Sequence, residues 1–252
     1  MKIVVLQKPG RFTSKDFKTN LEKYLGILKG EIVATTNFDG FTRNGWATVR
    51  VEGQDSEVVA TLIARELGGA QTNLATVEAN GVYEGVISEN NDELWVDIGI
   101  ETPRSIKARV GLYALRAQLA DGKPVPERRI IEDYCLIPGT RASVRLTRVE
   151  AGVIEGWLSD IQIDRFLSWM STGLDRIQIV DCYRHEVEAA IKQSRLERDV
   201  ASLETLTLTA QSVVCKLGTD AVGLIPKLGS TLRERELNTF IPRRIETRCR
   251  PW

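Results

Sequence analysis

Residues 93–100 (ELWVDIGI) alternate between apolar and outward-facing side chains along their whole length. Four aliphatic residues fall on one face of this segment: Leu94, Val96, Ile98 and Ile100. Trp95 and Asp97 fall on the other face. A period of two is that of a β-strand with one buried face. The pattern therefore predicts a strand that packs against a core and presents Trp95 outward.

The sequence pattern of the segments around this strand predicts further strands. We expect strands over residues 81–88, 93–100, 106–110, 141–149 and 153–158, with turns at Glu89–Asp92 and Glu150–Gly152. Residues 111–119 are predicted to form a short helix between the third and the fourth strand. Five strands with a helix in that position follow the OB order. Residues 79–159 are therefore predicted to form an OB-like β-barrel.

The sequence of this segment resembles the S1-type OB-fold RNA-binding domains. The similar features are Gly81-Val82 with Gly85-Val86, the strand Trp95–Gly99, and Gly139 followed at five residues by Val144. The resemblance covers about 80 residues and implies RNA binding by the barrel. The connection over residues 120–138 is longer than in the compact S1 form.

The first 78 residues have the pattern of a small α+β module. Strands are expected over residues 2–7, 31–36 and 46–51, with turns at Asp39-Gly40 and Asn44-Gly45. Ser14 and Asp55 are candidate caps of two helices with apolar stripes at helical spacing. A last strand over Leu74–Val77 would complete a ferredoxin-like β-α-β-β-α-β order.

Residues 160–252 are predicted to form a third module, also α+β. We expect a helix from Asp160, a strand over residues 176–182, a polar helix over 184–198 and a strand over 203–209. A hairpin is expected from residues 211–217 and 221–226, then a short helix over 230–238. The basic tail from Pro242 is expected to be loose.

The run from Val214 to Gly229 (VCKLGTDAVGLIPKLG), with the segments before it, resembles an archaeal family of conserved proteins of unknown function. The resemblance covers nearly the whole chain and implies an archaeal source and a three-part layout. It carries no activity, because the family has no assigned chemistry. An N-terminal module followed by an S1-like barrel also resembles the stalk subunit of archaeal RNA polymerase in module order.

Composition narrows the classes of function. Lys+Arg and Asp+Glu both number 34, whereas a protein that binds polyanions by charge alone is clearly basic. The 4 cysteines have no C-x-x-C spacing, and His185 is the one histidine, so no metal or cofactor site is predicted. Buried free thiols are expected. No signal peptide and no membrane-spanning run is recognised, which predicts a cytoplasmic protein.

Motifs for nucleotide binding are missing from the sequence. No G-x-x-x-x-G-K-[ST] occurs, and no G-x-G-x-x-G follows a strand. His185, at the start of a polar helix, is expected to be a surface residue. Asp97 is expected to form a cross-strand ion pair, or to orient an arginine.

The strongest functional pattern lies on the outer face of the predicted barrel. An exposed indole flanked by cationic groups offers a single strand of nucleic acid a stacking plane and partners for its phosphates. The candidate residues are Trp95, Arg104, Lys107, Arg109, Arg141 and Arg145. The alternative is that Trp95 is buried against a neighbouring module and that the arginines pair with nearby acids.

A second candidate is the tip of the hairpin expected near Gly218. Lys216, Thr219, Asp220 and Lys227 would surround this tip and could contact a ligand or a partner. The alternative is a plain tight hairpin, in which Asp220 caps its own turn.

Three hypotheses of function follow. The first is a non-enzymatic nucleic-acid-binding accessory protein, acting on RNA in archaeal translation, transcription or RNA processing, within a ribonucleoprotein or transcription complex. The second is an adaptor that binds a partner protein without nucleic acid. The third is an enzyme with a cleft between modules that uses Asp97, Asp220, Lys216 or His185.

Overall fold

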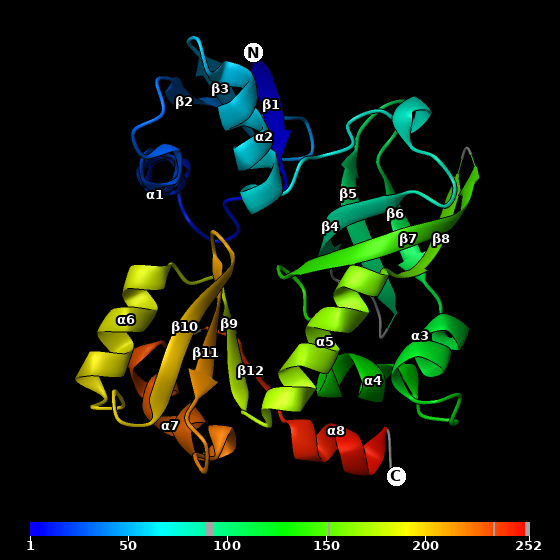
Figure 1. The fold of residues 1–252 in the computed structure, drawn as a ribbon, viewed down its shortest axis with the longest axis vertical. Coiled ribbons are helices and arrows are strands. Elements are labelled where there is room, and N and C mark those ends of the chain that lie inside the picture. Colours follow the sequence, from blue (N-terminus) through cyan, green and yellow to red (C-terminus); the bar gives the residue numbers. More distant parts are fainter. Residues whose placement is uncertain (89–92, 151, 234, 250–252) are drawn as a thin grey trace.

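The computed structural model describes residues 1–88, 93–150, 152–233 and 235–249 of the chain. Three units are visible in Figure 1: an N-terminal α+β unit, a β-barrel and a C-terminal α+β unit. The predicted turn at Glu89–Asp92, residue 151 of the second turn and the last three residues of the predicted tail lie outside the described residues.

The N-terminal unit is a three-stranded antiparallel sheet with two helices. Its elements are β1 (Lys2–Val5), α1 (Ser14–Lys29), β2 (Thr35–Phe41), β3 (Ala47–Glu52) and α2 (Ser56–Leu67), and its strand order is β1-β3-β2. The predicted succession β-α-β-β-α is confirmed. The two helices bury apolar faces against the sheet, in a cluster that includes Phe17, Leu21, Val59 and Ile63.

Two expectations for this unit are wrong. The Asp39-Gly40 turn lies within β2, which pairs with β3 and absorbs the irregularity as a register shift between Phe38 and Phe41. The predicted fourth strand is a short 3-10 helix, η1 (Leu74–Thr76), because the Asn73 side chain accepts a hydrogen bond from the Ala75 N–H and starts a turn. The ferredoxin-like sheet is therefore not completed.

Residues 82–158 form a closed barrel, as predicted. Its strands are β4 (Val82–Ser88), β5 (Leu94–Ile100), β6 (Ile106–Val110), β7 (Arg141–Glu150) and β8 (Val153–Leu158), in the order β4-β5-β6-β8-β7. The pair β6–β8 is parallel, and the other pairs are antiparallel. This order, with helices between the third and fourth strands, is OB-like.

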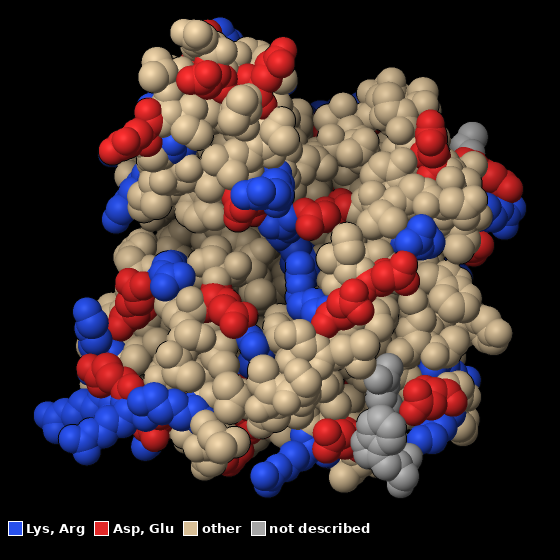
Figure 2. All heavy atoms as spheres, viewed as in Figure 1, with Lys and Arg blue, Asp and Glu red and all other residues tan. Residues whose placement is uncertain are grey.

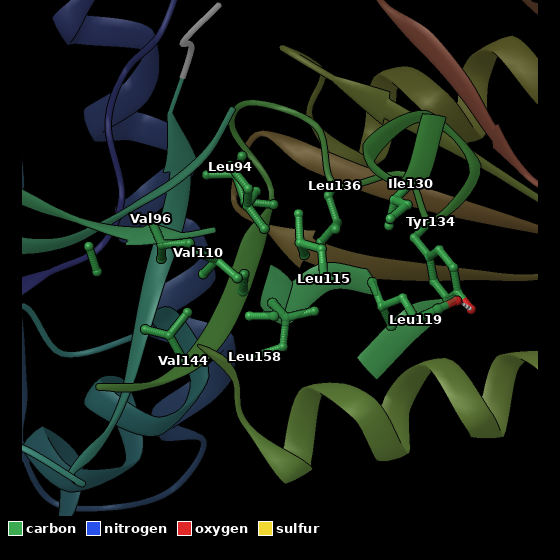
Figure 3. Packing of buried hydrophobic residues seen from close by; sticks show 14 of the residues in the cluster. Leu94, Val96, Val110, Leu115, Leu119, Ile130, Tyr134, Leu136, Val144 and Leu158 are labelled. Atoms are coloured by element: carbon green, nitrogen blue, oxygen red, sulfur yellow. Dashed lines mark hydrogen bonds between the residues drawn. The ribbon is translucent and has the colours of Figure 1, made fainter. Parts of the chain in front are cut away.

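The connection between β6 and β7 contains two helices, α3 (Leu112–Leu119) and the unpredicted α4 (Glu127–Asp133). They close one end of the barrel, where Leu115, Leu119 and Ile130 pack against strand residues such as Val110 (Figure 3). Tyr134 is buried beside them and donates a hydrogen bond from its hydroxyl to the Leu119 carbonyl at 3.0 Å. A buried phenol with a satisfied hydroxyl adds apolar contact without an unpaired polar group.

The C-terminal unit contains a four-stranded antiparallel sheet in the order β10-β11-β9-β12. Its elements are α5 (Asp160–Thr172), β9 (Arg176–Val180), α6 (Arg184–Gln193), β10 (Val200–Thr207), β11 (Ala210–Cys215), α7 (Ala221–Thr231), β12 (Leu237–Phe240) and α8 (Pro242–Arg248). Helices α6 and α7 share a buried cluster with β9 and β11.

Three predictions for this unit are wrong. The second arm of the expected hairpin is helix α7, because Asp220 accepts hydrogen bonds from the N–H groups of Val222 and Gly223 and caps a helix. The helix expected over residues 230–238 is replaced by the end of α7 and by β12. The tail from Pro242 forms α8, whose Ile245 is buried in the barrel cluster.

Two helices of the third unit pack with the barrel, and α5 also contacts the C-terminal sheet through Phe240 of β12. Phe166 and Trp169 of α5 and Ile245 of α8 belong to the same buried cluster as the barrel strands. No helix of the described part of the chain is long and apolar enough to cross a membrane. All four cysteines are free and buried, as predicted.

Candidate nucleic-acid interface on the barrel

The register of the barrel brings four outward-facing side chains into one row. Trp95 on β5 pairs with Arg109 on β6, Arg109 pairs with Glu155 on β8, and Glu155 pairs with Arg148 on β7. The residues that alternate with them, such as Val96 and Ala108, are fully buried in the barrel. Trp95 is partly exposed, so the prediction that it faces outward is confirmed.

This row crosses a groove, which we call the barrel groove, with a volume of about 830 Å³. The strands β5, β6, β7 and β8 all contribute to its lining. The lining residues are Trp95, Arg104, Ser105, Ile106, Lys107, Arg109, Arg148, Gly152, Val153, Ile154 and Glu155. The tertiary structure thus joins four of the six predicted residues, namely Trp95, Arg104, Lys107 and Arg109.

One carboxylate holds the indole and a guanidinium in place. Glu93 accepts a hydrogen bond from Trp95 Nε1 at 3.1 Å through one oxygen, and from Arg109 at 2.7 Å through the other. Both bonds are charge-assisted and fix the orientation of the two planar groups. The indole is therefore set in position before any ligand arrives, which lowers the entropy cost of stacking.

The charge of the groove is positive but partly compensated. Arg148 forms two hydrogen bonds of 2.8 Å with Glu150 and lies 4.0 Å from Glu155. Lys107 makes no ion pair within the described part of the chain. The Nε of Arg109 is buried and has no hydrogen-bond partner among the described residues. A phosphate could therefore pair with Lys107 without breaking an ion pair of the described residues, and it would share Arg109 with Glu93.

Arg141 does not reach the groove. Its guanidinium pairs with Glu84 and donates to the backbone carbonyl of Glu66 at 2.6 Å and to that of Arg65 at 3.3 Å. These carbonyls are at the end of α2, where a cation satisfies unpaired acceptors and the helix dipole. Burial lowers the pKa of Arg141 to about 10. Arg141 therefore ties the barrel to the N-terminal unit.

Arg145 also lies outside the groove, three residues before Arg148 on β7. It pairs with Asp160 at 2.8 Å, and 42% of its side chain is exposed. Its cross-strand neighbour is Trp157. Of the six candidate residues, Arg141 and Arg145 are thus not part of the groove, and both pair with acids, as the alternative interpretation expected.

A second cavity of about 240 Å³ lies where the three units meet. Lys8 lies 3.8 Å from the centre of the Trp46 ring and 3.4 Å from the Asp97 carboxylate. Asp97 also accepts a hydrogen bond from the Gly99 N–H at 3.0 Å and is 4% exposed. Asp97 therefore pairs with a lysine of another unit and not with an arginine across the barrel.

The turn of the second predicted site is present, but it leads into a helix instead of a second strand. Lys216 and Thr219 lie in the turn after β11, whereas Lys227 lies in the second turn of α7 and Asp220 caps that helix. Figure 2 shows basic and acidic side chains mixed over the face that this view presents, with several of both kinds in the crease between the units. That mixture agrees with the net charge of zero.

His185 is an exposed residue at the start of α6, as expected, and stacks on Tyr183 with ring centres 5.8 Å apart. No group of three or more potential metal-binding side chains occurs in the described residues. Burial raises the pKa values of the thiols, to about 12 for Cys182 and about 11 for Cys215. These thiols are protonated at neutral pH and do not form reactive thiolates.

Residues 174–240 match the DUF2110 C-terminal domain. This range begins just before β9 and ends with β12, so it coincides with the C-terminal sheet and its helices α6 and α7. No curated protein matches the chain. The barrel and its groove lie outside the matched range.

Among the charged residues that line the groove, Arg148 and Glu155 were not predicted from the sequence, and neither was Glu93, which holds Trp95 and Arg109 in place. Glu93 directly precedes β5, in the same alternation as Trp95, and could have been found from that pattern. Arg148 faces the groove because β7 shifts register between Leu146 and Arg148. A bulge of this kind reverses the alternation, and nothing in the local sequence marks it.

Proposed function

We propose that the barrel groove binds single-stranded nucleic acid, and RNA in particular. The observation that carries this proposal is the convergence of Trp95, Arg104, Lys107 and Arg109 in one groove on the second and third barrel strands. OB folds bind oligonucleotides on this pair of strands. The resemblance of residues 81–99 to S1-type domains favours RNA over DNA.

The chemistry of the groove fits a strand with exposed bases. A base can stack on the indole of Trp95, which Glu93 holds in position, and stacking contributes about 1–3 kcal/mol per base. Lys107 and the guanidinium of Arg109, whose side chain is 41% exposed, can meet phosphate oxygens. Glu155, between Arg109 and Arg148 in the strand register, can accept a hydrogen bond from an exocyclic amine of a base.

Binding of this kind depends on salt. If four cations of the groove meet phosphates, the logarithm of the affinity falls with a slope of about −2.8 against the logarithm of the salt concentration. Affinity would then fall about fiftyfold between about 50 and 200 mM salt. The carboxylates of Glu93 and Glu150 compete for the same cations, so the proposed binding is of modest affinity.

The test is a titration of labelled single-stranded RNA with the wild-type protein and with Trp95→Ala and Lys107→Glu. Each variant is expected to weaken binding, by about 5- to 150-fold for the lost stacking contact. Lys216→Glu is the matched control, because it reverses the same charge as Lys107→Glu. Lys216 is exposed and lies in a turn of the C-terminal unit. Equal affinity of all four proteins would reject the proposal.

A further inference from the structure

We propose that a bound single strand continues past the barrel groove to a second stacking platform formed by Tyr113 and Trp157. This inference rests on the proposed function of the groove and extends the site to a longer substrate. Tyr113 is 79% exposed at the start of α3, and its ring meets that of Trp157 edge to face with centres 6.1 Å apart. We call this pair the aromatic platform.

The strand register places the aromatic platform next to the groove. Trp157 is two residues beyond Glu155 on β8, on the same outward face, because Gly156 between them is buried. Two residues of a strand span about 7 Å. On the neighbouring strand β6, Arg109 of the groove is followed by Gly111 and then by α3 with Tyr113. Both strands thus lead from the groove to the platform.

The position of the platform is fixed by the packing of α3 on β8. The Gln118 side chain donates to the Leu158 carbonyl at 2.8 Å and accepts from the Leu158 N–H at 3.1 Å. These two hydrogen bonds to the backbone hold α3 against the strand that carries Trp157. Tyr113 is therefore kept at the surface by the helix, although a ring with this much exposed area gains little from the fold itself.

A cation accompanies the platform. Arg145 on β7 is the direct cross-strand neighbour of Trp157, and its partner Asp160 is 82% exposed at the side chain. An ion pair this open contributes about 0–1 kcal/mol, so a phosphate can replace the carboxylate at low cost. An aromatic face beside an arginine repeats the combination found at Trp95 and Arg109. This repetition points to a nucleic-acid strand as the occupant.

The experiment measures the affinity of oligouridylates of two lengths, about 4 and about 12 nucleotides, which span the site sizes of OB folds. The wild type is expected to bind the longer oligomer more tightly. Tyr113→Ala should weaken the longer oligomer by about 5- to 150-fold and leave the shorter one unchanged. Tyr113→Phe, which keeps the ring, should bind both as the wild type does. Trp95→Ala should weaken both.

The outcomes separate the two proposals. Suppose that the wild type binds both oligomers and that Trp95→Ala weakens this binding. If Tyr113→Ala then binds the longer oligomer as tightly as the wild type does, the platform is rejected and the groove stands. If the wild type binds neither oligomer, the groove is rejected and the platform with it. Because Tyr113 is exposed, its replacement is expected to leave the thermal midpoint of unfolding within about 1 °C of the wild-type value.

Discussion

On β5, Trp95 is partly exposed and lines the barrel groove, whereas Asp97, two residues further on the same face, is 4% exposed beneath the N-terminal unit. The arginines of the barrel divide in the same way. Arg109 reaches the groove with 41% of its side chain exposed, and Arg141 keeps 13% exposed against the end of α2. One half of the outer surface of the barrel is therefore covered by the other units, and the other half is open.

This difference shows that residue type alone does not determine the role of an outward-facing charged side chain. In the covered half, Asp97 and Arg141 each find a partner in the N-terminal unit, namely Lys8 and the carbonyls of α2. These pairs fix how the units sit together. In the open half, the partners of Arg109 and Arg148 among the described residues are local acids, and water or a ligand can compete for them.

The strongest test of this contrast is Arg141→Ala against Arg109→Ala. Removing Arg141 leaves Glu84 and two helix-end carbonyls without a cation, so the free energy of unfolding should fall by about 2–3 kcal/mol. Removing Arg109 should change it by about 0–1 kcal/mol. Urea unfolding followed by circular dichroism measures both. Arg109→Ala should weaken RNA binding more than Arg141→Ala does. Equal stability of the two variants would contradict the division of the barrel surface into a covered and an open half.

A second test concerns Lys8, which bridges Trp46 and Asp97 at the junction. Lys8→Ala should lower the free energy of unfolding by about 1–2 kcal/mol, because Asp97 is left buried without its cation and the ring contact is lost. For a chain of this size that corresponds to about 2–8 °C in the thermal midpoint. Lys2→Ala is the control, since the Lys2 side chain is 60% exposed and Asp39 keeps its second partner, Arg50. A midpoint unchanged by Lys8→Ala would show that the junction does not depend on this pair.

A third test uses the salt dependence of RNA binding in the open half. Lys107→Ala should make the slope of the logarithm of affinity against the logarithm of salt shallower by about 0.7, the contribution of one phosphate contact on a single strand. Titrations at several salt concentrations measure this slope. Lys216→Ala should leave it unchanged, because Lys216 lies in the C-terminal unit. The same slope in both variants would exclude a phosphate contact at Lys107.

The smallest expected effect concerns Glu127, whose carboxylate accepts a hydrogen bond from the N–H of Leu94 at 3.2 Å, beside the groove. Burial raises the pKa of Glu127, and the charge of Glu93 adds to this. A carboxyl with a raised pKa stabilises the fold most when protonated, so its contribution falls as the pH rises through the raised pKa. In Glu127→Gln this pH-dependent loss of stability, which we expect to be less than about 1 kcal/mol, should be absent. Thermal unfolding from acidic to neutral pH would show it, and an unchanged profile would count against this role.

Much of the barrel could be predicted from the sequence. The boundaries of β6 and β8, Ile106–Val110 and Val153–Leu158, agree with the predicted strands, because side chains that alternate between core and surface leave a direct pattern in the sequence. The outward direction of Trp95 follows from the same alternation. Helix α7 was missed because local turn residues around Gly218 suggest a hairpin, whereas Leu224 and Leu228 gain more by packing on the C-terminal sheet.

The sequence alone thus determined which side chains face outward from the barrel, since alternation is a local property of a strand. Only the tertiary structure decided which of them remain accessible, since that depends on units distant in sequence that cover Asp97 and Arg141 and leave Trp95 and Arg109 open. The physical reason is that a local pattern records on which side of a strand a residue lies. It does not record what other part of the chain packs against that side.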